Sequence, residues 1–189
     1  IDPFSQTVIV IAGNGNNGGD AIISHHFLLD YGINSTLILI KKSQLDSVFL
    51  DAYSINKEEI LIFEEEKNIP DFDWVIEGIF GIGLKREVSG IFADLIQQIN
   101  QNGNVISVDL PSGIYCDTGK TTGININADL TLALGYPKNG NLLNDGIYAS
   151  GDLCNLDIGF TELQLESYTT QLLTIYDISE LIQPYTVDA

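Results

Sequence analysis

Cysteine is scarce in this chain of 189 residues: it occurs twice, as Cys116 and Cys154, and methionine does not occur at all. Two cysteines without CxxC spacing cannot form a disulfide framework or a cysteine zinc site, so we expect unpaired thiols in a reducing compartment. No apolar run approaches the roughly 20 residues that cross a bilayer, and the short run at 8–12 lacks the basic lead-in of a signal peptide. We therefore expect a soluble, cytoplasmic protein without a membrane partner.

Basic residues are few as well, since 8 lysines and arginines stand against 26 aspartates and glutamates, giving a formal charge of -18. This charge repels nucleic acid and anionic membranes at long range, so neither is an expected partner. An anionic nucleotide would need local groups to hold it, such as backbone N–H groups at a helix start and a few well-placed cations.

The order of the apolar runs predicts the fold class. The runs at 7–12 (TVIVIA), 35–40 (STLILI) and 105–109 (VISVD) are typical of strands buried on both faces of a parallel sheet. Further strands are predicted at 60–63, 74–76, 130–134 and 153–156, and helices at 19–31, 43–53 and 90–100. Because strands and helices alternate, we expect an α/β fold with a parallel, doubly wound sheet. The length and the hydrophobic content of 44% predict a single domain over residues 1–189.

A glycine-rich segment follows the first predicted strand. It reads GNGNNGGD from Gly13 to Asp20 and contains GxGxxG between a strand and a helix, as the dinucleotide-binding fingerprint requires. Glycines at these positions let the backbone approach a pyrophosphate, although strand-to-helix turns that bind nothing can have the same pattern. The ordinary fingerprint expects an acidic residue after the second strand, and this chain has Lys41 and Lys42 there. A conventional nicotinamide-dependent oxidoreductase is therefore an alternative, not the expected function.

Two more polar segments follow predicted strands. Asp109 ends the run VISVD, where its carboxylate can accept a proton or ligate a cation, but an aspartate in this place is also a common turn former. The loop EGIFGIGLKRE, from Glu77 to Glu87, has adjacent basic residues that suit a phosphate, and its alternative interpretation is a mobile surface loop. Neighbouring parallel strands end at the same edge of a sheet, so the oxygen-bearing side chains there are expected to converge on one hard cation. These side chains belong to Asn17, Glu77, Asp109 and Ser112.

Four segments together resemble, in this order, the signatures of the YjeF N-terminal domain family, the NAD(P)HX epimerases. They are GNGNNGGD, GIFGIGL, VDLPSG followed by D-x-G, and ADLTLALGYPKNG, and the resemblance covers Val8 to Phe160. It implies a Rossmann-like three-layer α/β sandwich with a mostly parallel central sheet. It also implies an isomerase that interconverts the R and S forms of hydrated NADH and NADPH in nicotinamide nucleotide repair, with a potassium ion beside the substrate.

The resemblance assigns roles to individual residues. The implied substrate-binding residues are Asn16, Asn17, Gly18, Gly19, Asp20, Gly81, Ile82, Gly83, Leu84, Lys85, Arg86, Glu87 and Asp109. The implied potassium ligands are Asn17, Glu77 and Ser112, and the expected catalytic residues are Asp109, as the acid–base carboxylate, and Lys138. This chain departs from the family at Glu77, where the family usually has aspartate, and at Ala21, where it usually has glycine. The extra methylene of Glu77 would reposition a cation ligand.

The resemblance also bears on partners. It implies a homodimer and a functional partner, an ADP- or ATP-dependent dehydratase that consumes only one epimer and is fused to the same chain in many bacterial relatives. The family carries helices ahead of the first strand, and this chain opens at Ile1 without methionine, so we expect that its N-terminal part is missing and that a dehydratase domain can follow Ala189.

Two other functions remain open at this point. One is the oxidoreductase, which hydride transfer with intact cofactor would support. The other is a nucleotide-binding regulatory or scaffolding module on the same fold, because a fold does not determine a function. Adjacent His25 and His26 point in different directions from one helix, so we expect them to be structural or surface residues.

Overall fold

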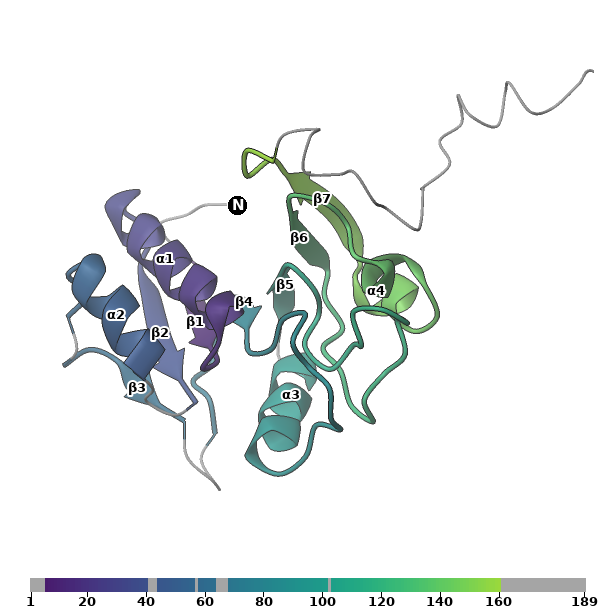
Figure 1. Ribbon diagram of the computed structural model, residues 1–189. Coiled ribbons are helices and arrows are strands. Elements are labelled where there is room, and N and C mark those ends of the chain that lie inside the picture. Colours follow the sequence, from purple (N-terminus) through teal and green to yellow (C-terminus); the bar gives the residue numbers. More distant parts are fainter. Residues whose placement is uncertain (1–5, 41–43, 57, 64–67, 102, 161–189) are drawn as a thin grey trace, which may run out of the picture. The chain divides into compact units, whose positions relative to one another are not determined.

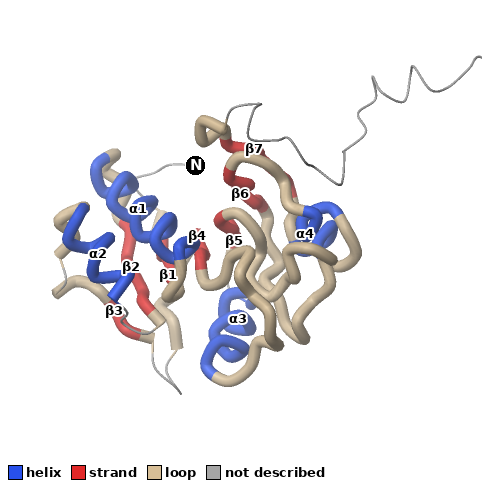
Figure 2. Tube along the Cα trace, viewed as in Figure 1, coloured by secondary structure: helices blue, strands red, loops and turns tan. Residues whose placement is uncertain are grey.

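A sheet of seven parallel strands forms the centre of the fold (Figures 1 and 2). The computed structural model describes residues 6–40, 44–56, 58–63, 68–101 and 103–160. Its strands are β1 Val8–Ala12, β2 Ser35–Leu39, β3 Leu61–Ile62, β4 Trp74–Gly78, β5 Asn104–Val108, β6 Leu130–Leu134 and β7 Asp152–Leu156. They lie side by side in the order β3-β2-β1-β4-β5-β6-β7, and every neighbouring pair is parallel. The order reverses between β1 and β4, the position at which open α/β sheets bind their ligands.

Helices cover both faces of this sheet. They are α1 Asn16–Asp30, α2 Gln44–Ala52, α3 Ile91–Gln101, α4 Asn139–Leu142 and α5 Gly146–Ala149. On one face, Val10 of β1 lies in a buried cluster with Ile22 of α1 and Leu50 of α2. On the other face, Ile11 of β1 lies in a cluster with Ile96 of α3. Successive residues of a strand point to opposite faces, so β1 contributes to both cores, and the predicted three-layer sandwich with a parallel sheet is confirmed.

The first helix begins three residues earlier than the sequence predicts, at Asn16 instead of Gly19. Glycine is a poor helix former, which is why the pattern favoured a later start. Close packing explains the glycines: a Cβ on Gly18 would lie 1.8 Å from the carbonyl oxygen of Gly13, and a Cβ on Gly19 would lie 2.2 Å from the ring of Phe49. Neighbouring atoms therefore leave no room for a side chain at positions 18 and 19.

The predicted strands and helices are otherwise confirmed, with ends that differ by one or two residues. Ser43, at which the helix over 43–53 is predicted to begin, lies outside the described residues, as do Lys41 and Lys42. Contacts group Ile1–Ile158 into one compact unit and Gly159–Ala189 into a second, of which only Gly159 and Phe160 are described. A single domain over residues 1–189 thus stays a prediction. Both cysteines are free thiols, and no helix among the described residues is long and apolar enough to cross a membrane.

Candidate functional site

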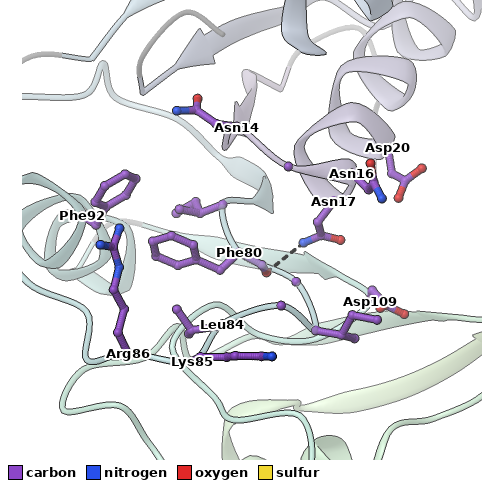
Figure 3. Close-up of a pocket in the computed structure, with 15 residues that line it drawn as sticks. Asn14, Asn16, Asn17, Asp20, Phe80, Leu84, Lys85, Arg86, Phe92 and Asp109 are labelled. Carbon is purple, nitrogen blue, oxygen red and sulfur yellow. Dashed lines mark hydrogen bonds between the residues drawn. The ribbon is translucent and has the colours of Figure 1, made fainter. Parts of the chain in front are cut away.

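A cavity of about 670 Å³ opens where the strand order reverses, at the carboxyl ends of β1, β4 and β5 (Figure 3). We call it the switch-point pocket. Residues of the β1–α1 turn and of α1, residues of the loop after β4, one residue of α3 and one residue after β5 form its wall. They are Asn14, Gly15, Asn16, Asn17, Asp20, Ile79, Phe80, Gly81, Ile82, Gly83, Leu84, Lys85, Arg86, Phe92 and Asp109. Three of the predicted motifs therefore meet in one pocket.

The start of α1 gives the pocket a positively polarised wall. Gly15 is the N-cap and has extended backbone angles, and Gly19 N donates to Gly15 O at 3.1 Å as the first intrahelical bond. The backbone N–H groups of Asn16, Asn17 and Gly18 consequently have no acceptor within the helix. Such a helix start attracts anions through these N–H groups and through the helix dipole.

Asn17 joins the glycine-rich turn to the loop after β4. Its side chain is buried, and Nδ2 donates to the carbonyl oxygen of Phe80 at 2.9 Å, a bond drawn in Figure 3. The backbone strengthens this junction, because Gly13 N donates to the carbonyl oxygen of Gly78 at 3.0 Å. The ring of Phe80 packs against that of Phe92 on α3, with ring centroids 4.9 Å apart. These contacts anchor the first residues of the loop after β4 to the glycine-rich turn and to α3.

Glu77, at the end of β4, is completely buried behind the pocket wall. Its Oε1 accepts hydrogen bonds from Ser107 Oγ at 2.6 Å and Ser112 N at 3.1 Å. Its Oε2 accepts from Ser112 Oγ at 2.6 Å and Ile79 N at 3.1 Å. Burial raises the pKa of the Glu77 carboxyl, and the four hydrogen bonds oppose this rise because they favour the charged form.

Asp109 follows β5 with a left-handed backbone conformation, φ 69°. The left-handed conformation is uncommon for residues with a Cβ, although aspartate adopts it more often than most, and it is found at functional sites. Its Oδ1 accepts a hydrogen bond from Leu134 N at 3.0 Å and forms an ion pair with Lys138 Nζ. Lys138 Nζ also donates to the carbonyl oxygen of Leu134 at 2.8 Å. The carboxylate is therefore fixed at the pocket wall, with one oxygen bound to β6 and to Lys138.

A second carboxyl group lies in the same pocket, on Asp20 of α1. Desolvation by burial raises the pKa of Asp20 above its ordinary value, and the negative charge of Asp109 raises it further. The pocket therefore contains two carboxyl groups that differ in environment: Asp109 is ion-paired, while Asp20 keeps a proton to higher pH than an ordinary aspartate.

The basic residues of the loop after β4 lie at the rim. Lys85 and Arg86 are exposed, and both line the pocket. They are the basic residues among its lining, and the chain as a whole has a formal charge of -18. The rim and the start of α1 together offer the local positive charge that an anionic ligand needs.

Most of the residues that the resemblance assigns to the substrate line the pocket. Gly18, Gly19 and Glu87 do not, although the N–H group of Gly18 belongs to the unbonded start of α1. Ser107, Phe80 and Phe92 were missed by the sequence interpretation. Ser107 had a signal, a polar residue within the apolar run VISVD, whereas nothing in the sequence links Phe92 of α3 to this pocket.

His25 lies away from the switch-point pocket, at the other end of α1. Its Nδ1 lies 2.7 Å from Ser35 Oγ at the start of β2, and both residues are buried. Burial lowers the pKa of His25, and the neighbouring His26 lowers it further, whereas the charge of Glu59 raises it. His26 pairs with Asp30 on the same helix at 3.3 Å. These contacts agree with the expected structural roles.

Comparisons with known proteins agree with the geometry. Residues 2–140 match the family described as YjeF-related protein N-terminus. The chain is 34% identical to an NAD(P)H-hydrate epimerase of Limosilactobacillus fermentum, with 83% of this chain and 77% of that protein aligned. It is 34% identical to an NAD(P)H-hydrate epimerase of Levilactobacillus brevis, over 80% of this chain and 72% of that protein.

Two further similarities concern longer proteins. A bifunctional NAD(P)H-hydrate repair enzyme, Nnr, of Thermofilum pendens is 32% identical over 85% of this chain, and the chain spans 33% of that protein. A crystal structure of yeast ynu0, YNL200c, superposes with a TM-score of 0.60 at 23% identity, over 75% of this chain and 63% of that one. The structural similarity supports the fold.

Proposed function

This chain belongs to the YjeF-related protein N-terminus family, the family of the NAD(P)H-hydrate epimerases, and we propose that its switch-point pocket interconverts the R and S epimers of hydrated NADH and NADPH. The reaction is an isomerisation within nicotinamide nucleotide repair. The observation that carries the proposal is the Asp109 carboxylate, fixed by β6 and Lys138 in a pocket of about 670 Å³ at the strand-order reversal. Ligand pockets commonly have volumes of roughly 300 to 1,000 Å³.

The phosphates are bound at the start of α1 and at the rim. The unbonded N–H groups of Asn16, Asn17 and Gly18 provide donors, and Lys85 and Arg86 provide positive charge. These groups are local, which lets a strongly acidic chain bind a dinucleotide. The loop after β4 also contributes the apolar side chains of Ile82 and Leu84 to the pocket lining.

The reacting carbon of the substrate carries a hydroxyl group and is bonded to a ring nitrogen. Inversion by loss and return of water proceeds in balance: a proton reaches the hydroxyl oxygen, the C–O bond breaks to release water, and the nitrogen lone pair stabilises the cation. Water then adds to the opposite face and gives up a proton. Ring opening would instead take the proton from the hydroxyl group as the carbonyl forms and deliver a proton to the ring nitrogen, and ring closure on the opposite face would reverse both transfers. Asp109 exchanges the proton and stabilises the cation by its charge.

Lys138 and Asp20 complete this arrangement. Lys138 holds Oδ1 of Asp109 and also donates to Leu134 O, so it orients a carboxylate that belongs to the pocket lining. Asp20 has a pKa raised by burial and by the charge of Asp109, so it keeps a proton to higher pH than an ordinary aspartate. Two carboxyl groups in different environments are a usual basis for dividing acid and base roles.

The resemblance also implies a potassium ion ligated by Asn17, Glu77 and Ser112, and the residues of this chain do not fit it. A carboxylate has about four acceptor sites, and N–H and O–H donors use all four on Glu77. Ser112 Oγ donates to Glu77 and accepts from Phe80 N at 2.8 Å. No step of the proposed mechanism therefore involves a bound ion.

The partners follow from the substrate and from the longer relatives. The Thermofilum pendens relative is named a bifunctional repair enzyme, and the chain spans a third of it. We propose that the present domain acts together with an ADP- or ATP-dependent dehydratase that removes one epimer. The homodimer, and a cytoplasmic location where NADH and NADPH are abundant, stay predictions.

The test is to incubate the protein with the purified R epimer of hydrated NADH and to follow the S epimer by chromatography. We expect the two epimers to reach equilibrium much faster than in buffer, with no net oxidation or reduction. An unchanged epimer ratio despite tight binding would favour the binding module, and hydride transfer from intact NADH would favour the oxidoreductase.

A further inference from the structure

The Glu77 carboxylate connects three segments of the wall behind the switch-point pocket. Through Ser107 Oγ it contacts β5, and through the N–H and Oγ of Ser112 it contacts the turn after β5. Through Ile79 N it contacts the loop after β4. All four hydrogen bonds are 3.1 Å or shorter, and the side chain is fully buried. One side chain thus fixes the relative positions of the loop and the turn.

Asp109 lies between two of these contacts in the sequence, since Ser107 precedes it and Ser112 follows it. Its backbone has the left-handed conformation, φ 69°, which a residue with a Cβ rarely adopts without enforcement. Leu134 N and Lys138 hold the Asp109 side chain, but the conformation of its backbone depends on where β5 ends and the turn begins. Glu77 holds the end of β5 through Ser107 and the turn after it through Ser112.

The length of the Glu77 side chain matters for this role. The family usually has aspartate at this position, and an aspartate is one methylene shorter. From the same backbone position on β4, a shorter carboxylate cannot keep the 2.6 Å contacts to both Ser107 Oγ and Ser112 Oγ unless the strands shift. A shorter side chain would leave a gap between its carboxylate and the hydroxyl groups of Ser107 and Ser112. The longer glutamate brings its oxygens within hydrogen-bond distance of both.

A cation and a hydrogen-bond donor compete for the same oxygen lone pairs. Because Glu77 has all four acceptor sites occupied by protein donors, a cation could bind it only by displacing Ser107, Ser112 or Ile79. Displacing them would leave buried N–H or O–H groups without partners, which is unfavourable. The closed set of hydrogen bonds therefore disfavours ion binding.

We propose that Glu77 is the positioning residue for the Asp109 turn in this chain, and that protein N–H and O–H donors occupy its carboxylate oxygens where a monovalent cation would bind, so that neither folding nor activity requires potassium. The part that concerns activity rests on the proposed function of Asp109. The part that concerns the ion does not, because it can be measured without substrate.

The first test is thermal unfolding of the unmodified protein in potassium, lithium and choline chloride at equal ionic strength. A ligand that binds only the native state stabilises it by RT ln(1 + [L]/Kd), so Tm continues to rise as the ligand concentration increases above Kd. We expect the same Tm in potassium as in choline over the millimolar range. A rise in Tm that is specific to potassium would overturn the proposal, whatever the enzymatic activity of the protein.

The second test compares Glu77→Asp with Glu58→Asp, which makes the same chemical change at an exposed site outside the pocket. We expect Glu77→Asp to lower Tm in choline and to regain part of the loss in potassium, because the shortened carboxylate no longer uses all its acceptor sites. For Glu58→Asp we expect the Tm of the parent in both choline and potassium. A Glu77→Asp protein whose Tm equals that of the parent in every salt would contradict the proposal.

Kinetics separate positioning from mere stability. If Glu77 positions Asp109, Glu77→Asp should lower kcat roughly 10- to 100-fold at a temperature where the variant is folded, with KM nearly unchanged and with partial rescue by potassium. An unchanged kcat would reject the positioning role. If no epimerisation is found even in the parent, the proposed function fails. The salt dependence of Tm still shows whether the folded protein binds potassium.

Discussion

Lys138 Nζ forms an ion pair with Asp109 Oδ1 and donates at the same time to the carbonyl oxygen of Leu134 at 2.8 Å. Both partners are largely buried, with side chains 19% and 13% exposed. Lys138 follows β6 and Asp109 follows β5, so the pair links the ends of two adjacent strands at the pocket. This link explains how an aspartate with a strained backbone keeps a defined carboxylate orientation.

Replacing Lys138 with methionine tests the link. The variant keeps the apolar stem but removes the ammonium group, so Asp109 loses the contact that holds Oδ1. We expect kcat for epimerisation to fall roughly 10- to 100-fold. The control is Lys120→Met, at an exposed lysine outside the pocket. Equal kcat values for the two variants would show that Lys138 does not orient the carboxylate.

The glycine at position 18 should be required for folding and not only for binding. A Cβ there would lie 1.8 Å from Gly13 O and 2.9 Å from Gly13 N, which are backbone atoms that cannot move independently. We expect Gly18→Ala to lower the free energy of unfolding by about 3 kcal/mol or more. Gly83→Ala is the matched control, since its Cβ would meet nothing within 4 Å. Chemical denaturation of both variants measures the difference, and similar midpoints would contradict the close packing.

The phosphate site predicts a charge effect on binding. Replacing Lys85 and Arg86 together with glutamine removes the basic residues of the pocket lining while leaving polar side chains at the exposed rim. We expect KM to rise roughly 10-fold or more, with kcat changing much less, because these residues act on binding. The rise should shrink at high salt, where exposed charges are screened. A fall in kcat at constant KM would assign them a different role.

His25 makes stability depend on pH in a defined direction. Burial lowers its pKa in the folded state, so the unfolded chain binds the proton more readily. The free energy of unfolding should therefore decrease as pH falls below about 6.5, the ordinary pKa of histidine, and continue to decrease down to the lowered folded-state pKa. His25→Gln should show a shallower decrease of Tm between pH 7 and 5 than the parent. Parallel curves would indicate that His25 does not contribute.

The fold and the location of the site follow from local patterns in the sequence. Runs such as TVIVIA and VISVD predict buried parallel strands, and glycine and polar residues at their carboxyl ends predict a site at one edge of the sheet. Sequence alone also found Asn17, Asp109 and Lys85, because each belongs to a motif that directly follows a strand.

Other features depend on contacts between distant segments. Phe92 reaches the pocket because α3 packs beside the loop after β4, which no local pattern encodes. The role of Gly19 depends on Phe49 of α2, thirty positions away. The hydrogen bonds of Glu77 depend on the register of β4 and β5, which brings Glu77 opposite Ser107. Sequence interpretation named Glu77 as a potassium ligand, but it could not show that four protein donors already use the carboxylate oxygens.

The rate of epimerisation by Asp109→Asn shows whether the Asp109 carboxylate carries out the acid–base chemistry of the reaction. Asparagine has nearly the same shape as aspartate but neither its charge nor its capacity to accept a proton. The measurement is the initial rate at which purified R epimer becomes S, for parent and variant, with the unaided rate subtracted at each pH and with substrate affinity determined separately. We expect kcat to fall roughly 100- to 10,000-fold, with a much smaller loss of affinity. A corrected rate equal to that of the parent would contradict the acid–base role of Asp109.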